Sequence, residues 1–148
     1  MAAMILALLE EQVNAKQVKD CLEDCGHEVF VVDTFVRAKE LLSAQEIDLI
    51  VSDVHLENGG NVFDFLRFVK KNERTSKIPF VLFSAQPTPV AKYLADGVRI
   101  SSRILGAVEY IQMEIFDAVK FKEQINVLLP PKKQSANLER KIHKKDGE

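Results

Sequence analysis

The chain has 148 residues, of which 47% are hydrophobic, and a formal net charge of -2. This length fits one domain with enough apolar residues to fill its core. The apolar runs are far too short to cross a bilayer, and no secretory signal is evident. Residues 130–148 are basic and the rest is net acidic, which excludes a general footprint for nucleic acid. We therefore expect a globular, cytoplasmic protein without direct nucleic-acid or membrane contacts.

Short apolar runs alternate with helical patterns along most of the chain. The expected strands are residues 4–9, 28–32, 49–51 leading to Asp53, 78–83 and 108–112. Five strand-helix units in strict alternation imply a parallel sheet with right-handed crossovers and helices on both faces. We predict a doubly wound α/β domain over residues 1–129, with the flavodoxin-like strand order 2-1-3-4-5. Residues 130–148 are polar and charged, and we expect a flexible basic tail or linker there.

Capping residues mark several ends of the expected helices. Gly26 is placed to end the first helix, Thr34 to cap the second and Asn61 to cap the third. A last helix is expected over residues 115–129, burying one apolar face and ending at a pair of prolines. The side chains on that face are Ala118, Phe121, Ile125 and Leu128.

The fourth helix has an apolar face of its own. Thr88-Pro89 is a strong helix start, since proline is favoured at the first helical position, and Gly106 ends the pattern. Between them, apolar and small residues recur at helical spacing, and we predict that this face packs inward. Its members are Val90, Leu94, Gly97, Ser101 and Ile104.

Polar side chains follow three of the expected strands. Asp53 comes directly after a buried apolar run, Glu10 or Glu11 after the first strand, and Ser84 after the fourth. In open α/β sheets the ligand site lies at the carboxyl ends of the strands, so these groups should converge. Carboxylates there could hold Mg²⁺, and an Asp carboxylate can itself attack phosphorus to form an acyl phosphate. Taken alone, residues 47–60 fit a loop-capping Asp53 equally well.

These motifs together resemble the receiver domain of two-component response regulators, of which the chemotaxis response regulator is the best-known small member. The resemblance covers about residues 4–129. It is carried by Leu49-Ile50-Val51-Ser52-Asp53, Gly59-Gly60, Ile78-Pro79 leading to Ser84-Ala85, and Gly106-Ala107 leading to Tyr110.

The resemblance implies a role for each matching residue. Asp53 corresponds to the phospho-acceptor, served by a histidine kinase or phosphotransfer protein, Ser84 to the switch hydroxyl and Tyr110 to the switch aromatic. A plain strand aromatic explains Tyr110 equally well. The implied Mg²⁺ ligands are Glu10, Asp53 and the backbone carbonyl of His55. The implied output is through the face formed by the fourth helix, fifth strand and fifth helix, toward a downstream protein, an output domain or a second copy.

Three departures from the family pattern make this an atypical receiver. Leu9-Glu10 stands where the family has an acidic pair, so one carboxylate is missing and Mg²⁺ should bind weakly. Met113-Glu114 stands where the family has a Lys, usually followed by Pro, which removes a cation that would pair with a phosphoryl group. The segment 84–113 is also longer than usual, and we expect its extra length in the fourth helix.

Two alternatives follow from the same residues. One is a pseudo-receiver, a protein-interaction module that works without phosphorylation. The absence of the family's Lys and of one of its two carboxylates favours this alternative. The other is a flavodoxin-like or nucleotide-binding enzyme, because one sheet architecture hosts many activities. The first strand is followed by Glu10-Glu11-Gln12-Val13, without a glycine-rich phosphate loop, which disfavours that class. We expect a signalling module rather than an enzyme.

Overall fold

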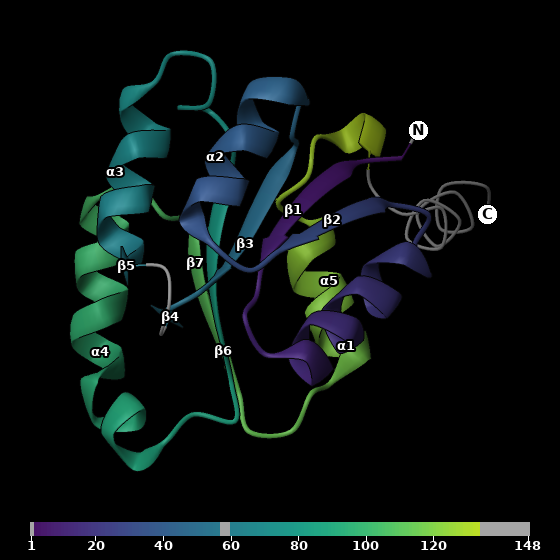
Figure 1. Ribbon diagram of the computed structural model, residues 1–148. Coiled ribbons are helices and arrows are strands. Elements are labelled where there is room, and N and C mark those ends of the chain that lie inside the picture. Colours follow the sequence, from purple (N-terminus) through teal and green to yellow (C-terminus); the bar gives the residue numbers. More distant parts are fainter. Residues whose placement is uncertain (1, 57–59, 134–148) are drawn as a thin grey trace.

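A computed structural model describes residues 2–56 and 60–133 of the chain. Its centre is a five-stranded parallel sheet in the order β2-β1-β3-β6-β7 (Figure 1). The strands are β1 Met4–Leu8, β2 Glu28–Val32, β3 Leu49–Asp53, β6 Phe80–Ala85 and β7 Glu109–Met113. In chain order of these five strands this arrangement is 2-1-3-4-5, so the predicted fold is confirmed.

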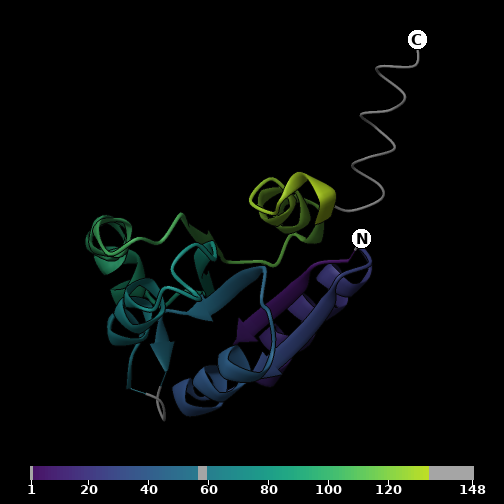
Figure 2. The ribbon, with the colours of Figure 1, turned by 90° about the horizontal axis from the view of Figure 1, so that it is seen from above.

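Five α-helices cover the two faces of the sheet (Figures 1 and 2). They are α1 Gln12–Glu23, α2 Phe35–Ala44, α3 Val62–Lys71, α4 Pro89–Ile104 and α5 Ala118–Asn126. Helices α1 and α5 lie on one face, and α2, α3 and α4 lie on the other. Among the residues described, no helix is long and apolar enough to span a membrane.

The predicted caps operate through side-chain oxygens and left-handed glycines. The Thr34 hydroxyl accepts from the backbone N–H of Arg37, and the Asn61 side chain accepts from that of Phe63. Gly26 and Gly106 follow their helices with φ of +88° and +110°, a region where side chains with a Cβ are strained. These local signals fix where each helix turns back toward the next strand.

Each face of the sheet has its own apolar core. Alternate residues of β6 point to opposite sides, so Phe83 packs in the cluster under α1 and α5, while Phe80 packs in the cluster under α2 and α3. Phe83 stacks edge-on against Phe121 of α5, and Phe80 lies beside Phe65 of α3. Burial on both faces explains why the strands are continuous apolar runs rather than alternating ones.

The link between β3 and α3 contains a feature that was not predicted from the sequence. Two short strands, β4 His55–Leu56 and β5 Gly60–Asn61, pair antiparallel and form a small two-stranded sheet. Of the predicted Gly59-Gly60 loop, Gly59 lies outside the described residues.

The fifth helix is shorter than predicted. It begins at Ala118, after the N-cap Asp117, rather than near residue 115. Ala118 is exposed, so its predicted burial is wrong; it is the first residue of the helix, ahead of the turns that pack on the core. Phe121 and Ile125 are buried as predicted, and Leu128 is half-buried against the same cluster.

Helix α4 turns the opposite face to the sheet from the one that was predicted. Its buried residues are Ala95 and Ser102, with Val98 partly buried beside them. Every member of the predicted inward face is exposed, including Val90 at 66% and Ile104 at 80%. Small side chains suit the contact with the sheet here, so the larger apolar residues are left on the outside.

The chain continues past α5 into a short 3-10 helix, η1 Pro131–Lys133. Lys133 forms an ion pair of 3.0 Å with Asp48, whose carboxylate also accepts the backbone N–H of Met4. This contact ties residue 133 to the strand ends opposite the candidate site. The rest of the predicted tail, residues 134–148, lies outside the described part of the chain.

Candidate functional site

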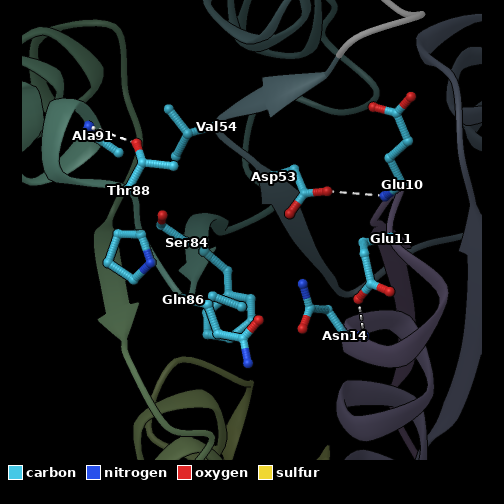
Figure 3. A pocket seen from close by; sticks show the side chains of 12 residues that line it. Glu10, Glu11, Asn14, Asp53, Val54, Ser84, Gln86, Thr88 and Ala91 are labelled. Carbon is cyan, nitrogen blue, oxygen red and sulfur yellow. Dashed lines mark hydrogen bonds between the residues drawn. The ribbon is translucent and has the colours of Figure 1, made fainter.

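The carboxyl ends of β1, β3 and β6 open into a cavity of about 430 Å³ (Figure 3). Its wall combines the turn after β1, the start of α1, the end of β3 and the segment joining β6 to α4. The lining residues are Glu10, Glu11, Asn14, Asp53, Val54, Phe83, Ser84, Ala85, Gln86, Pro87, Thr88 and Ala91. The fold therefore brings together the predicted acids and hydroxyl at one edge of the sheet.

Asp53 is the half-buried carboxylate of this cavity. Its Oδ2 accepts the backbone N–H of Glu10 at 2.9 Å, which joins β3 to the end of β1. Burial raises the pKa of Asp53 to about 6; the hydrogen bond from Glu10 opposes this rise, and the charges of Glu10 and Glu11 add to it. At neutral pH the group is mostly ionised and more basic than an ordinary aspartate.

The two glutamates after β1 have different surroundings. The Glu11 carboxylate accepts the backbone N–H groups of Val13 and Asn14, at 3.0 and 2.8 Å, and so caps α1. Figure 3 shows the Glu10 side chain extending away from the Asp53 carboxylate, although its backbone N–H contacts Asp53. Glu11 is therefore committed to the helix start, whereas Glu10 lines the cavity with its carboxylate directed away from that of Asp53.

Asn14 and Gln86 are cavity residues that sequence reasoning missed. Asn14 lies in the first turn of α1 and directs its amide into the space beside Asp53 (Figure 3). Gln86 follows β6 with φ of +47°, an uncommon conformation for a residue other than glycine. The signal for Asn14 was its place in the first turn of a helix that follows a strand end. Gln86 carried no comparable signal.

Ser84 lies within β6 rather than after it, because the strand extends to Ala85. Its side chain is half-buried and lines the cavity with that of Thr88. The Thr88 hydroxyl accepts the backbone N–H of Ala91 at 3.1 Å and caps α4. Ser84 therefore lines the cavity from within the strand, and the Thr88 hydroxyl is occupied at the start of α4.

The position of the missing lysine is filled by an apolar side chain. Met113 is buried in the same cluster as Phe83 and Phe121, and its carbonyl accepts the backbone N–H of Gln86 at 2.8 Å. The next residue, Glu114, forms an ion pair with Lys92 of α4. No lysine, arginine or histidine is among the described residues that line the cavity.

Tyr110 lies two residues from the register partner of Ser84 on β7, beneath α4. It is buried, with 6% of its surface exposed, and the Arg99 guanidinium lies over its ring at 5.1 Å from the centroid. Ser84 pairs in register with Gln112, whose buried side-chain Nε2 has no hydrogen-bond partner among the described residues. Tyr110 is not part of the cavity wall, so any link between it and Asp53 runs through this part of the sheet.

The predicted magnesium ligands form only a partial set. Among the described residues, no group of three His, Cys, Asp or Glu side chains is placed to hold a metal ion. His55 begins β4 two residues after Asp53. In proteins Mg²⁺ keeps several waters and is often held by only one or two carboxylates. The carboxylates of Asp53 and Glu10 therefore have the donor chemistry of a magnesium site, one that would bind the ion weakly.

Comparison with known proteins gives a consistent picture of the fold. No protein-family model matches the chain. It is 30% identical over 88 residues to the probable transcriptional regulator ycf29 of Pyropia yezoensis, covering 58% of this chain and 38% of that protein. It is 27% identical over 96 residues to the two-component response regulator ORR11 of Oryza sativa, covering 63% of this chain and 65% of that protein. The chain therefore spans between about two fifths and two thirds of these curated relatives.

A solved structure supports the same class. The receiver domain of the sensor histidine kinase PA1611 from Pseudomonas aeruginosa aligns with a TM-score of 0.70 and 18% identity, covering 86% of this chain and 98% of that domain. That domain is described with a magnesium ion coordinated in its active-site cleft. The chain has the receiver-domain fold, with a strand-end aspartate at the site edge of the sheet. Its sequence is similar to those of response regulators.

Proposed function

We propose that this chain is a cytoplasmic, atypical receiver domain of a two-component system that takes a phosphoryl group on Asp53. The observation that supports this most strongly is the half-buried Asp53 carboxylate at the carboxyl end of β3, in a cavity shared with Ser84. Burial raises the pKa of Asp53 to about 6, which makes the carboxylate more basic than an ordinary aspartate. At neutral pH it is still mostly ionised, as a carboxylate nucleophile must be.

The phosphoryl donor is a phosphohistidine of a histidine kinase or phosphotransfer protein. An Asp53 carboxylate oxygen attacks phosphorus and forms an acyl P–O bond, while the P–N bond breaks and its electron pair returns to the leaving imidazole. The backbone N–H of Glu10 on Oδ2 orients the carboxylate during this step. Asp53 and Glu10, with the His55 carbonyl, would hold Mg²⁺, which offsets charge on a phosphoryl group when it is bound.

The Ser84 hydroxyl is the group that would respond to a phosphoryl group on Asp53. Its hydroxyl can donate to a phosphoryl oxygen in the cavity, and its strand is paired with β7, which carries Tyr110. A shift of Ser84 would alter the packing of Tyr110 under α4, and the α4, β7 and α5 face would report it to a downstream protein or output domain. Without a cation at Met113 this response is weaker than in a receiver that has the lysine.

One observation favours a second candidate, a phosphorylation-independent interaction module. Met113 fills the lysine position with a buried apolar side chain, and Glu11 is occupied as a helix cap. Both features reduce the charge machinery that a phosphoryl group would engage. In this case the chain would signal through its helical surface alone.

Incubation with acetyl phosphate and Mg²⁺ followed by intact-mass spectrometry separates the two candidates. The proposed function predicts a mass increase of one phosphoryl group, lost in Asp53→Asn but retained in Glu11→Gln, which changes an acid on the cavity wall. An unmodified wild type, under conditions where a receiver of known activity is labelled, favours the interaction module.

A further inference from the structure

Gln112 places an amide on the face of β7 that lies toward α4. Alternate residues of a strand point to opposite faces of the sheet. Ile111 and Met113 belong to the apolar cluster under α1 and α5, and Tyr110 belongs to the cluster on the other face. Gln112 therefore projects to the same side as Tyr110, where the buried strands of a parallel sheet usually carry apolar side chains.

The side-chain nitrogen of Gln112 is a buried donor that the described part of the fold does not use. The residue is half-buried, and its Nε2 has no hydrogen-bond partner among the residues that the structure describes. A buried donor without a partner costs free energy, and native proteins keep few of them. Its presence here indicates a hydrogen bond that is made in another state of the protein.

Ser84 is the neighbour of Gln112 on the adjacent strand. The two residues are partners in the β6–β7 register, as are Leu82 and Tyr110 two residues earlier, so all four project to one face (Figure 1). Neighbouring strands lie about 4.8 Å apart, and the terminal torsion of a glutamine side chain turns at little cost. The Gln112 amide is thus placed to reach the Ser84 hydroxyl.

We propose that Gln112 is a positioning residue that follows Ser84 when Asp53 carries a phosphoryl group. This inference rests on the proposed function and deepens it. The Ser84 hydroxyl donates its hydrogen to a phosphoryl oxygen and accepts the Nε2–H of Gln112. No covalent bond changes in this step; a chain of two hydrogen bonds joins the phosphoryl group to β7.

The bond between Gln112 and Ser84 favours the phosphorylated state for two reasons. A hydroxyl that donates to a charged phosphoryl oxygen is polarised and becomes a better acceptor. The same bond gives the buried Nε2 the partner that it lacks. A contact made in one state only shifts the equilibrium toward that state, so Gln112 supplies part of the response at a site where Met113 supplies no cation.

Gln112 also lies beside the residue that is expected to report the change. Tyr110 projects from the same face of β7 two residues away, and the Arg99 guanidinium of α4 lies over its ring. A Gln112 side chain that turns toward Ser84 changes the packing beside Tyr110 and thereby its contact with α4. The response therefore passes from Asp53 through Ser84 and Gln112 to Tyr110.

Nuclear magnetic resonance of the full chain in Mg²⁺, with and without beryllofluoride as a stand-in for the phosphoryl group, tests the proposal. The backbone amide of Asp53 reports whether the site is occupied. The side-chain amide protons of Gln112 should move downfield as they gain a hydrogen bond. Gln112→Leu should lower the equilibrium constant of the shift at Tyr110 by about fivefold, the factor that one typical hydrogen bond contributes, while the Asp53 amide still responds.

Gln124→Leu is the matched control. Gln124 is also a half-buried glutamine with an unpartnered side-chain atom, but it lies on α5, which covers the opposite face of the sheet. Each Leu variant removes a buried unpaired polar atom, so both should unfold at the same urea concentration as wild type or a higher one. Gln112→Leu should weaken the response at Tyr110, and Gln124→Leu should leave it unchanged.

A double variant tests whether the two side chains act in series. Because Gln112 acts through the Ser84 hydroxyl, Ser84→Ala combined with Gln112→Leu should respond as Ser84→Ala does alone. An Asp53 signal that moves while the Gln112 side chain does not, or a Gln112→Leu variant that responds as fully as wild type, would overturn the role of Gln112 and leave the proposed function standing. So would a loss of response in Gln124→Leu equal to that in Gln112→Leu. A wild-type Asp53 amide that does not move would overturn the proposed function, and the role of Gln112 with it.

Discussion

Replacing Asp53 with Asn should stabilise the protein at neutral pH while removing its proposed reactive group. Burial raises the pKa of Asp53 to about 6 in the folded protein, and its usual value in an unfolded chain is about 3.9. The ionised form is therefore disfavoured by folding. The Asn side chain has no charge to desolvate, and its carbonyl oxygen can still accept the backbone N–H of Glu10.

The magnitude follows from linkage between protonation and folding. A difference of about two pKa units corresponds to about 3 kcal/mol at a pH where the group is ionised in both states. Because the carboxylate is only half-buried, solvent screening reduces this, and we expect a gain of about 1 to 3 kcal/mol for Asp53→Asn at pH 7.5. The wild-type penalty grows as pH rises from about 4 to 6, so the gain should disappear below about pH 4.

Urea unfolding of wild type and Asp53→Asn at pH 7.5 and at pH 4 measures this directly. The predicted result is a higher unfolding midpoint for the variant at pH 7.5 and matching midpoints at pH 4. Glu11→Gln serves as a control for the loss of one negative charge from the same cavity wall. A variant that is less stable than wild type at pH 7.5 would refute the view that Asp53 is a carboxylate held at an energetic cost.

Three further predictions concern the same site. Glu11→Ala should lower the free energy of unfolding by about 1 kcal/mol in urea titrations, because its carboxylate caps α1; an unchanged midpoint would contradict that role. Affinity for Mg²⁺, measured by calorimetry, should fall as pH drops through about 6, where Asp53 takes up a proton, and should be insensitive to pH in Asp53→Asn. Met113→Lys should enlarge the population shift around Ser84 and Tyr110 in beryllofluoride and Mg²⁺ by about tenfold or more, as amide chemical shifts would report; an equally full response in wild type would argue against a missing cation.

The sheet and most of the site could be predicted because their signals are local. Continuous apolar runs such as the one before Asp53 mark strands buried on both faces, and residues at strand ends converge once the strand order is known. The roles of the two glutamates could not be separated in this way. Which of them caps α1 depends on backbone angles at the turn, and the sequence shows only two adjacent acids.

Helix α4 shows where periodicity is insufficient. Val90 and Ile104 recur at a helical spacing, which reveals an apolar face but not what covers it. The helix contacts the sheet through Ala95 and Ser102, whose small side chains give a weak hydrophobic signal. The prediction that the larger residues pack inward was wrong because the face of α4 that carries Ala95 and Ser102 contacts the sheet instead.

Locating an acyl phosphate in the chain tests the central claim most directly. After treatment with acetyl phosphate and Mg²⁺, borohydride reduces an aspartyl phosphate to homoserine, which peptide mass spectrometry can place. The proposed function predicts homoserine at position 53 in wild type and none in a sample left untreated with acetyl phosphate. Homoserine at any other aspartate, with Asp53 recovered intact, would contradict it.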